Sequence, residues 1–106
     1  MSQTLELVQQ LAANGEVRIS EHGYDELAAD NILVQDILLG ISSAVLVEDY
    51  PDYFKGPCVL VLQQDQAGQP LHVLWGIASK KTTPAVVVTA YRPEKTLWSD
   101  DFRTRL

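Results

Sequence analysis

The chain has 106 residues, 46% of them hydrophobic and 21% charged, a balance typical of one folded domain rather than a disordered or repetitive segment. Its formal net charge of −6 makes it a poor non-specific ligand for polyanions, because phosphate binding depends on lysine and arginine. No apolar run approaches the roughly 18 residues of a membrane span, and the N-terminus has no signal-peptide pattern, so we expect a cytoplasmic protein without a membrane partner.

Helical patterns occupy the first 40 residues of the chain. Residues 3–13 are predicted to form a helix, because apolar side chains recur there at helical spacing. A short strand is predicted at 17–19, where apolar and charged residues alternate. Ser20 is a good N-cap for a second helix over 21–29, and a third helix is predicted over 33–39.

Strand patterns dominate the rest of the chain. We predict strands over 43–49, 58–64, 71–78 and 85–91, with a hairpin loop at 65–69. Helices followed by a run of strands with short connections are typical of an α+β fold. The predicted architecture is a set of N-terminal helices packed on one face of an antiparallel meander of about four strands.

Two of these strands are apolar on both faces, since residues 58–62 and 85–89 show no alternation. A strand of this kind is covered on both sides. The helices cover one side. The other side needs either a second subunit or the C-terminal segment that carries Leu97, Trp98 and Phe102.

Charge is unevenly distributed between the two halves of the chain. Residues 1–54 carry ten acids and one base, whereas residues 55–106 carry seven bases and four acids. This split is compatible with a local basic patch, with two solvated surfaces of a monomer, and with the acidic half of one copy binding the basic half of another.

His22 is the first residue with a chemistry of interest. It lies in the first turn of the second predicted helix, and Asp25 and Glu26 follow at the spacing that places them on the same helix face. A carboxylate beside an imidazole raises its pKa and orients it, as a general acid or base requires. The same pattern also fits an exposed histidine in a helix-capping turn.

His72 is the second histidine. The strand alternation points it away from Leu71 and Val73, toward the strand that carries Thr89 and Tyr91. Either a site residue or a histidine bonded at a sheet surface fits this position. Two histidines and a carboxylate can bind a metal, but no spacing selects such a site, so we expect neither a metal nor another cofactor.

The end of the last predicted strand carries further candidates. Arg92 has the geometry to hold a phosphate or a carboxylate, and Tyr91 supplies a phenol. An ion pair between Arg92 and an acid of the N-terminal half is the simpler interpretation. Cys58 lies in a buried apolar strand, where burial raises the pKa of a thiol and disfavours a nucleophilic role.

Several blocks of the sequence resemble the DUF4258 family of small uncharacterised proteins. The blocks are Ile19-Ser20-Glu21-His22-Gly23, Asp30-Asn31-Ile32, the strand residues from Gly56 to Leu62 and from Pro70 to Gly76, and Val88-Thr89-Ala90-Tyr91-Arg92-Pro93 with Trp98 after it. The resemblance covers about residues 17–105. It implies one DUF4258-like domain over 1–106, with 1–16 as an extra N-terminal helix.

The resemblance also implies a layout similar to that of RelE/barnase-like toxin ribonucleases. By this analogy His22 is a candidate proton-transfer residue, and Thr89, Tyr91 and Arg92 are candidates for binding a scissile phosphate. Many members of the family have arginine four and eight residues after the histidine, where this sequence has Glu26 and Asp30. Two anions in place of two cations weaken the binding of a phosphate ligand.

Two functions therefore remain open. The first is a non-catalytic interaction or accessory protein whose partner is another protein or a second copy of itself. The alternative is a metal-independent endoribonuclease in which His22 or His72 moves protons and Arg92 stabilises the phosphate, with RNA as the partner. The acidic balance and the doubly apolar strands favour the first function.

Overall fold

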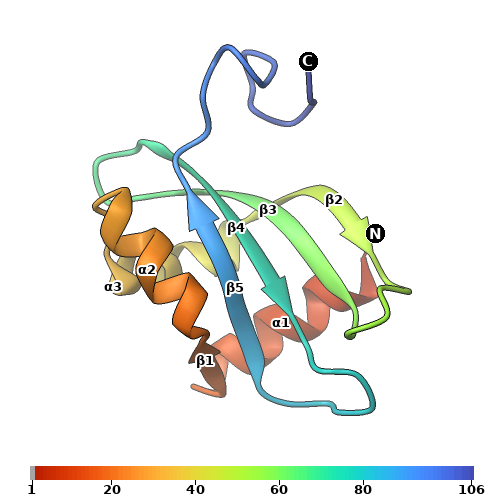
Figure 1. Cartoon of the computed structure of the whole chain (residues 1–106). Helices are drawn as coiled ribbons and strands as arrows, with labels where there is room; N and C mark the ends of the chain where they lie inside the picture. Colours follow the sequence, from red (N-terminus) through yellow and green to blue (C-terminus); the bar gives the residue numbers. More distant parts are fainter. Residues whose placement is uncertain (1) are drawn as a thin grey trace.

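The computed structural model describes residues 2–106 and contains three α-helices beside a five-stranded sheet (Figure 1). The predicted single domain begins at residue 1, which lies outside the described residues. No helix within residues 2–106 is long and apolar enough to cross a membrane.

The helical half of the chain folds as its periodicity predicts. Helix α1 (Gln3–Ala13) is followed by strand β1 (Val17–Ile19), helix α2 (Glu21–Ala29) and helix α3 (Val34–Gly40). α3 starts one residue later than predicted, because Leu33 occupies its N-cap position and offers no side-chain oxygen to the first turn.

The other four strands form the predicted antiparallel meander. They are β2 (Val45–Tyr50), β3 (Cys58–Gln64), β4 (Pro70–Gly76) and β5 (Ala85–Tyr91). β2 begins two residues later than predicted because a short 3-10 turn, Ile41–Ser43, precedes it. The α+β architecture is therefore confirmed, with helices packed against a largely antiparallel sheet.

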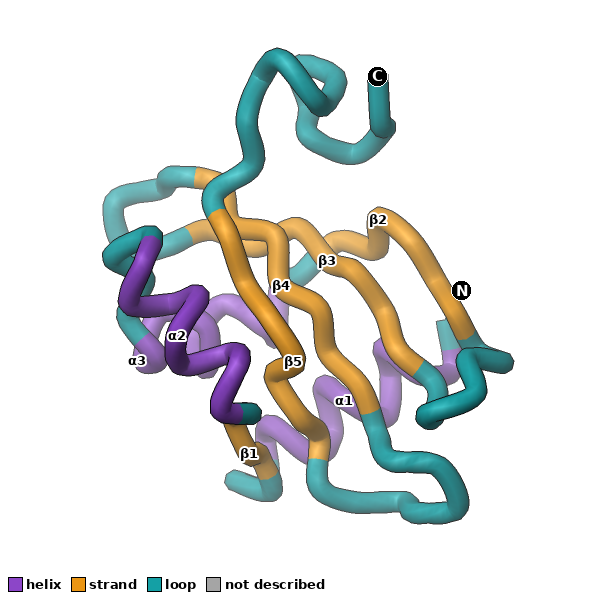
Figure 2. The backbone as a smooth tube through the Cα atoms, viewed as in Figure 1, coloured by secondary structure: helices purple, strands orange, loops and turns teal. Residues whose placement is uncertain are grey.

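Strand β1 adds a feature that the meander prediction does not contain. The strand order is β1-β5-β4-β3-β2, and β1 pairs with β5 in parallel, from Val17 opposite Ala85 to Ile19 opposite Val87. The sheet is therefore mixed, with one parallel pair at its edge. Figure 2 shows β1 as the short outer strand, with α2 continuing from it.

Ser20 and Gly23 hold the start of α2 against the edge of β5, beyond the point where β1 ends. The Ser20 hydroxyl donates to the Val88 carbonyl (2.9 Å) and accepts from the Gly23 N–H (2.9 Å), so one side chain caps the helix and ties it to the strand. A Cβ at Gly23 would lie 2.9 Å from the Val87 carbonyl oxygen, which is too close. Only glycine allows the helix to approach the strand this closely.

The core lies between the helices and one face of the sheet. Side chains from α1, α2, α3 and alternate strand positions meet there and are almost fully buried: Val8, Leu11, Leu27, Ile37, Val59, Val61, Leu71, Val73, Trp75 and Val87. Trp75 is the largest fully buried side chain of this core, and its indole N–H donates to the Gln63 side chain (2.9 Å). The opposite face of the sheet, here called the open face, carries the candidate site.

Candidate functional site

His72 is the most enclosed polar group on the open face. β4 places it opposite Tyr91 of β5, as its predicted direction requires, and none of its surface is exposed. Its Nε2 lies 2.7 Å from the Phe102 carbonyl oxygen, and its Nδ1 lies 3.0 Å from the Tyr91 hydroxyl. Because a carbonyl can only accept, Nε2 carries the proton and Nδ1 accepts from Tyr91.

The C-terminal tail, residues 93–106, covers this end of the open face. The Trp98 ring packs edge-on against the His72 ring with 4.3 Å between centroids, and only 4% of Trp98 is exposed. The prediction that Trp98 packs as part of the tail is confirmed. In Figure 1 the tail leaves the end of β5 and curls over that end of the sheet.

An ion pair fastens the far end of the tail. Arg105 donates from Nε to one carboxylate oxygen of Glu48 (2.8 Å) and from Nη2 to the other (3.0 Å). The Tyr50 hydroxyl also donates to Glu48 (2.7 Å). Arg105 stacks over the Trp98 ring at 4.7 Å, so the clamp and the aromatic cover form one structure. We call this enclosed region the sealed end.

The sealed end changes the acidity of its groups. Burial lowers the pKa of His72 below its usual 6.5, although its bond to Phe102 opposes the shift. The hydrogen bond from Arg105 lowers the pKa of Glu48, and burial raises the pKa of Tyr91. At neutral pH, His72 is therefore uncharged and Glu48 is ionised.

The other end of the open face is an uncovered apolar hollow of about 490 Å³. Gly76, which lies between Cys58 and Val86 in the sheet, lines it and adds no side chain to it. Leu74 and Val88 complete its apolar floor. We call this region the open end.

Three aromatic residues and a lysine border the open end. Tyr50 and Tyr53 line it, and the Phe54 ring packs at a tilt against Tyr53 with 4.9 Å between centroids while remaining 77% exposed. Lys55 holds its ammonium 5.8 Å from the Phe54 ring centre. Burial raises the pKa of Cys58, as expected from its apolar strand.

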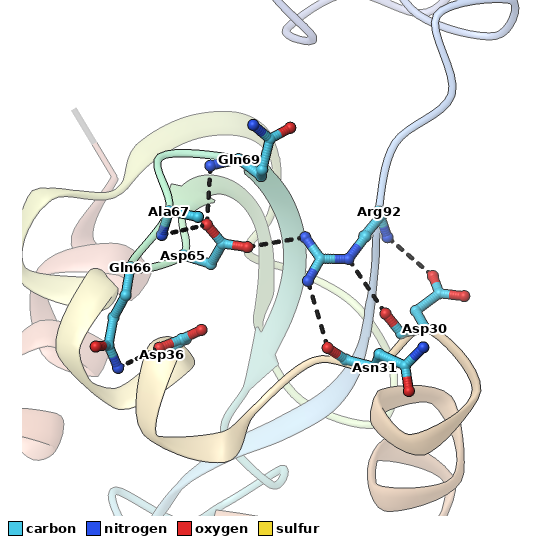
Figure 3. Close-up of polar contacts among 8 residues, drawn as sticks. All are labelled: Asp30, Asn31, Asp36, Asp65, Gln66, Ala67, Gln69 and Arg92. Carbon is cyan, nitrogen blue, oxygen red and sulfur yellow. Dashed lines mark hydrogen bonds and ion pairs between the residues drawn. The ribbon is translucent and has the colours of Figure 1, made fainter.

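Arg92, which follows β5, bridges the loop at Asp30–Asn31 and the loop that begins at Asp65 (Figure 3). Its guanidinium donates to the Asp65 carboxylate (3.0 Å) and to the main-chain carbonyls of Asp30 (3.1 Å) and Asn31 (3.4 Å). The Asp30 carboxylate accepts from the Arg92 backbone N–H (2.9 Å). The ion-pair partner is therefore Asp65 of the C-terminal half, rather than the expected acid of the N-terminal half.

The remaining sequence candidates lie apart from one another. His22 is largely exposed in the first turn of α2, with its Nε2 3.5 Å from Glu26. Thr89 lies on β5 opposite Leu74, on the same face as Tyr91. The structure thus brings His72 and Tyr91 together, and no hydrogen bond within residues 2–106 joins either of them to His22 or Arg92.

Some participants have no clear sequence signal. Nothing in the local pattern links Glu48 to Arg105, because the two are distant in sequence and exposed charges are common. Asp65 is different, because an aspartate three residues before Gly68 is typical of a turn in which its carboxylate accepts main-chain N–H groups. It does accept from Ala67 (2.9 Å) and Gln69 (2.8 Å).

Comparison with known proteins identifies the family. Residues 19–92 match a family model described as "Domain of unknown function (DUF4258)". The chain matches no curated protein and no solved structure, so its similarity to RelE/barnase-like ribonucleases is not confirmed. Within residues 2–106 no group of three histidine, cysteine or acidic side chains could hold a metal ion. The family model spans most of the chain, from β1 to Arg92, and the chain belongs to the DUF4258 family.

Proposed function

We propose that this chain is a non-catalytic interaction protein that pairs with a second copy of itself through the open end of the sheet. The observation that carries the proposal is the apolar hollow beside Gly76, which lies on a sheet face whose other end is tightly covered. Uncovered apolar surface of this kind is typical of a binding surface, because its burial releases water and stabilises a complex.

A second copy is the favoured occupant because the surface is self-complementary. The open end combines a hollow with the protruding ring of Phe54 next to it. A two-fold axis repeats every contact, so the Phe54 ring of each copy can enter the hollow of its partner. Both contacts bury an aromatic ring against apolar side chains.

Charge supports the same arrangement. Asp52 lies in the loop after β2, together with Lys55, which lines the hollow, and Lys80 and Lys81 lie in the loop before β5. A two-fold axis parallel to the strands places the β2 side of one copy opposite the β5 side of the other. Asp52 of each copy then lies on the side that faces Lys80 and Lys81 of the other, in keeping with the acidic and basic halves of the chain.

Light scattering during size-exclusion chromatography tests the proposal. At micromolar concentration we expect twice the chain mass of 11.8 kDa. Phe54→Ala is expected to return the protein toward the single-chain mass. Leu39→Ala is the matched control, since Leu39 is also exposed (61%) but lies on α3, away from the hollow. A wild-type mass of 11.8 kDa throughout this range would contradict the proposal.

The ribonuclease alternative has less support. Arg92 is occupied by Asp65 and two carbonyls, and His72 is beneath the C-terminal tail. No hydrogen bond within residues 2–106 joins His22 to either of them. Its test is incubation of the purified protein with mixed RNA, beside His22→Ala and His72→Ala. Cleavage by the wild type that either variant lacks would favour the alternative over the interaction function.

A further inference from the structure

The outer edge of β1 has free main-chain hydrogen-bonding groups. Glu16 accepts from the Ala85 N–H (3.0 Å), and the Ser20 N–H donates to Val87 (3.1 Å), so the even-numbered residues direct their main-chain groups toward β5. The alternation of a strand then directs the N–H and C=O groups of Val17 and Ile19 outward. Within residues 2–106 no strand lies beyond this edge.

A second hollow, of about 450 Å³, lies next to this edge. It is formed where the end of α1, the outer side of α2 and the α3 helix approach β1. Its lining is mostly apolar and includes Ala12, Ile19, Val34 and Leu38, with the half-exposed Tyr24 at its border. A strand added at β1 would direct every second side chain into this hollow.

Arg18 gives the edge a charge preference. It is the one base among residues 1–54, which carry ten acids, and it makes no ion pair within residues 2–106. Arg18 also lines the hollow, although strand alternation directs its side chain toward the face opposite Val17 and Ile19. An added strand would therefore meet the apolar hollow with one set of side chains and the Arg18 guanidinium with the other.

We propose that the β1 edge binds an extended segment of a partner protein in which a carboxylate side chain is flanked by two apolar residues. The outward groups of Val17 and Ile19 supply two donors and two acceptors to its main chain. The hollow accepts the apolar side chains, and Arg18 pairs with the carboxylate. Arg18 is in register with Val86, which lines the open end, so this surface adjoins the one through which self-association is proposed.

Selection from a phage-displayed library of random peptides tests the proposal. The selected peptides are expected to contain an apolar-acidic-apolar pattern. A synthetic copy of one selected peptide, titrated into labelled protein, is expected to shift the amide signals of Val17 and Ile19. Peptides without this pattern, or shifts confined to the hollow beside Gly76, would overturn the proposal.

Charge reversal makes the test sharper. Arg18→Glu is expected to weaken the binding of the selected peptide about tenfold, which corresponds to a loss of about 1.4 kcal/mol of binding free energy. A peptide with lysine in place of its acid is expected to bind that variant better than it binds the wild type. Arg103→Glu is the matched control, because Arg103 is exposed in the C-terminal tail. Equal effects of the two substitutions would overturn the proposal, whereas Phe54→Ala is expected to leave peptide binding unchanged.

Discussion

The two ends of the open face differ in how their side chains are shielded from water. At the sealed end, His72 and Glu48 each have hydrogen-bonding partners, and the C-terminal tail excludes water from His72. At the open end, the strands are equally apolar, but Gly76 leaves a hollow that no segment within residues 2–106 fills. The comparison indicates that polar groups on this sheet are satisfied within the chain, whereas apolar surface is left for a partner.

The largest effect is expected from the aromatic cover of the sealed end. Trp98→Ala removes a buried ring that packs on His72 and should lower the free energy of unfolding by about 3 kcal/mol. Leu97→Ala is the neighbouring control, because Leu97 is 59% exposed and should change stability by less than about 0.5 kcal/mol. Urea denaturation measures both, and equal losses would mean that the tail does not seal His72.

The floor of the open end depends on Gly56. Its φ of +122° favours glycine, and an added Cβ would clash with the Ile77 carbonyl oxygen. Gly56→Ala should therefore destabilise the fold by about 2 kcal/mol or more. Gly68→Ala is the control that distinguishes backbone strain from steric clash. Gly68 also has a positive φ (+78°), but an added Cβ there would meet no atom within 4 Å. The midpoint temperature of thermal unfolding should be much lower for Gly56→Ala than for Gly68→Ala, and the reverse order would refute this explanation.

The buried histidine gives the sealed end a pH dependence. Because folding lowers the pKa of His72, the unfolded chain binds more protons than the folded chain below pH 6.5. The contribution to stability is complete above that pH and is lost as the pH falls toward the folded pKa.

Denaturation at several pH values between pH 6.5 and about pH 5 measures this slope. His72→Gln removes the titrating group, so the variant should lose the part of the slope that His72 contributes. His22→Gln is the matched control, since it makes the same substitution at an exposed histidine outside the sealed end. A wild-type slope that survives His72→Gln would show that another group causes it.

The smallest effect is expected from the clamp between Arg105 and Glu48. Arg105 is 62% exposed, so solvent and salt screen the pair. Arg105→Ala should cost about 0.5 kcal/mol at low salt, and the cost should shrink as salt is added. A loss that does not depend on salt would show that Arg105 acts mainly by packing on Trp98 rather than by charge.

Hydrophobic patterning predicted most of the fold, and the reasons are local. Helices over 3–13 and 21–29 and strands over 58–64 and 85–91 occupy the predicted residues, because each has a clear period and a turn or cap at its ends. The parallel pairing of β1 was not predictable in this way. Three residues carry too little pattern to specify a neighbour, and their partner lies far along the chain.

The candidate site was only partly predictable. Strand alternation directed His72 toward the strand of Tyr91, and the doubly apolar strands called for a cover, with the tail as one of two expected covers. The partners of Arg92 and Arg105 depend on how loops close in space, and sequence spacing carries no information on that. The hollow beside Gly76 depends on a missing side chain between two neighbouring strands, which becomes visible only when the register is known.

The reactivity of Cys58 tests the contrast between the two ends most directly. It is the one cysteine of the chain and lines the open hollow, so alkylation by a maleimide reports access to that surface alone. We expect the alkylation rate to fall as the concentration of wild-type protein rises through the micromolar range, and to stay constant for Phe54→Ala. A wild-type rate that does not change with concentration would contradict the claim that a second copy covers the open end.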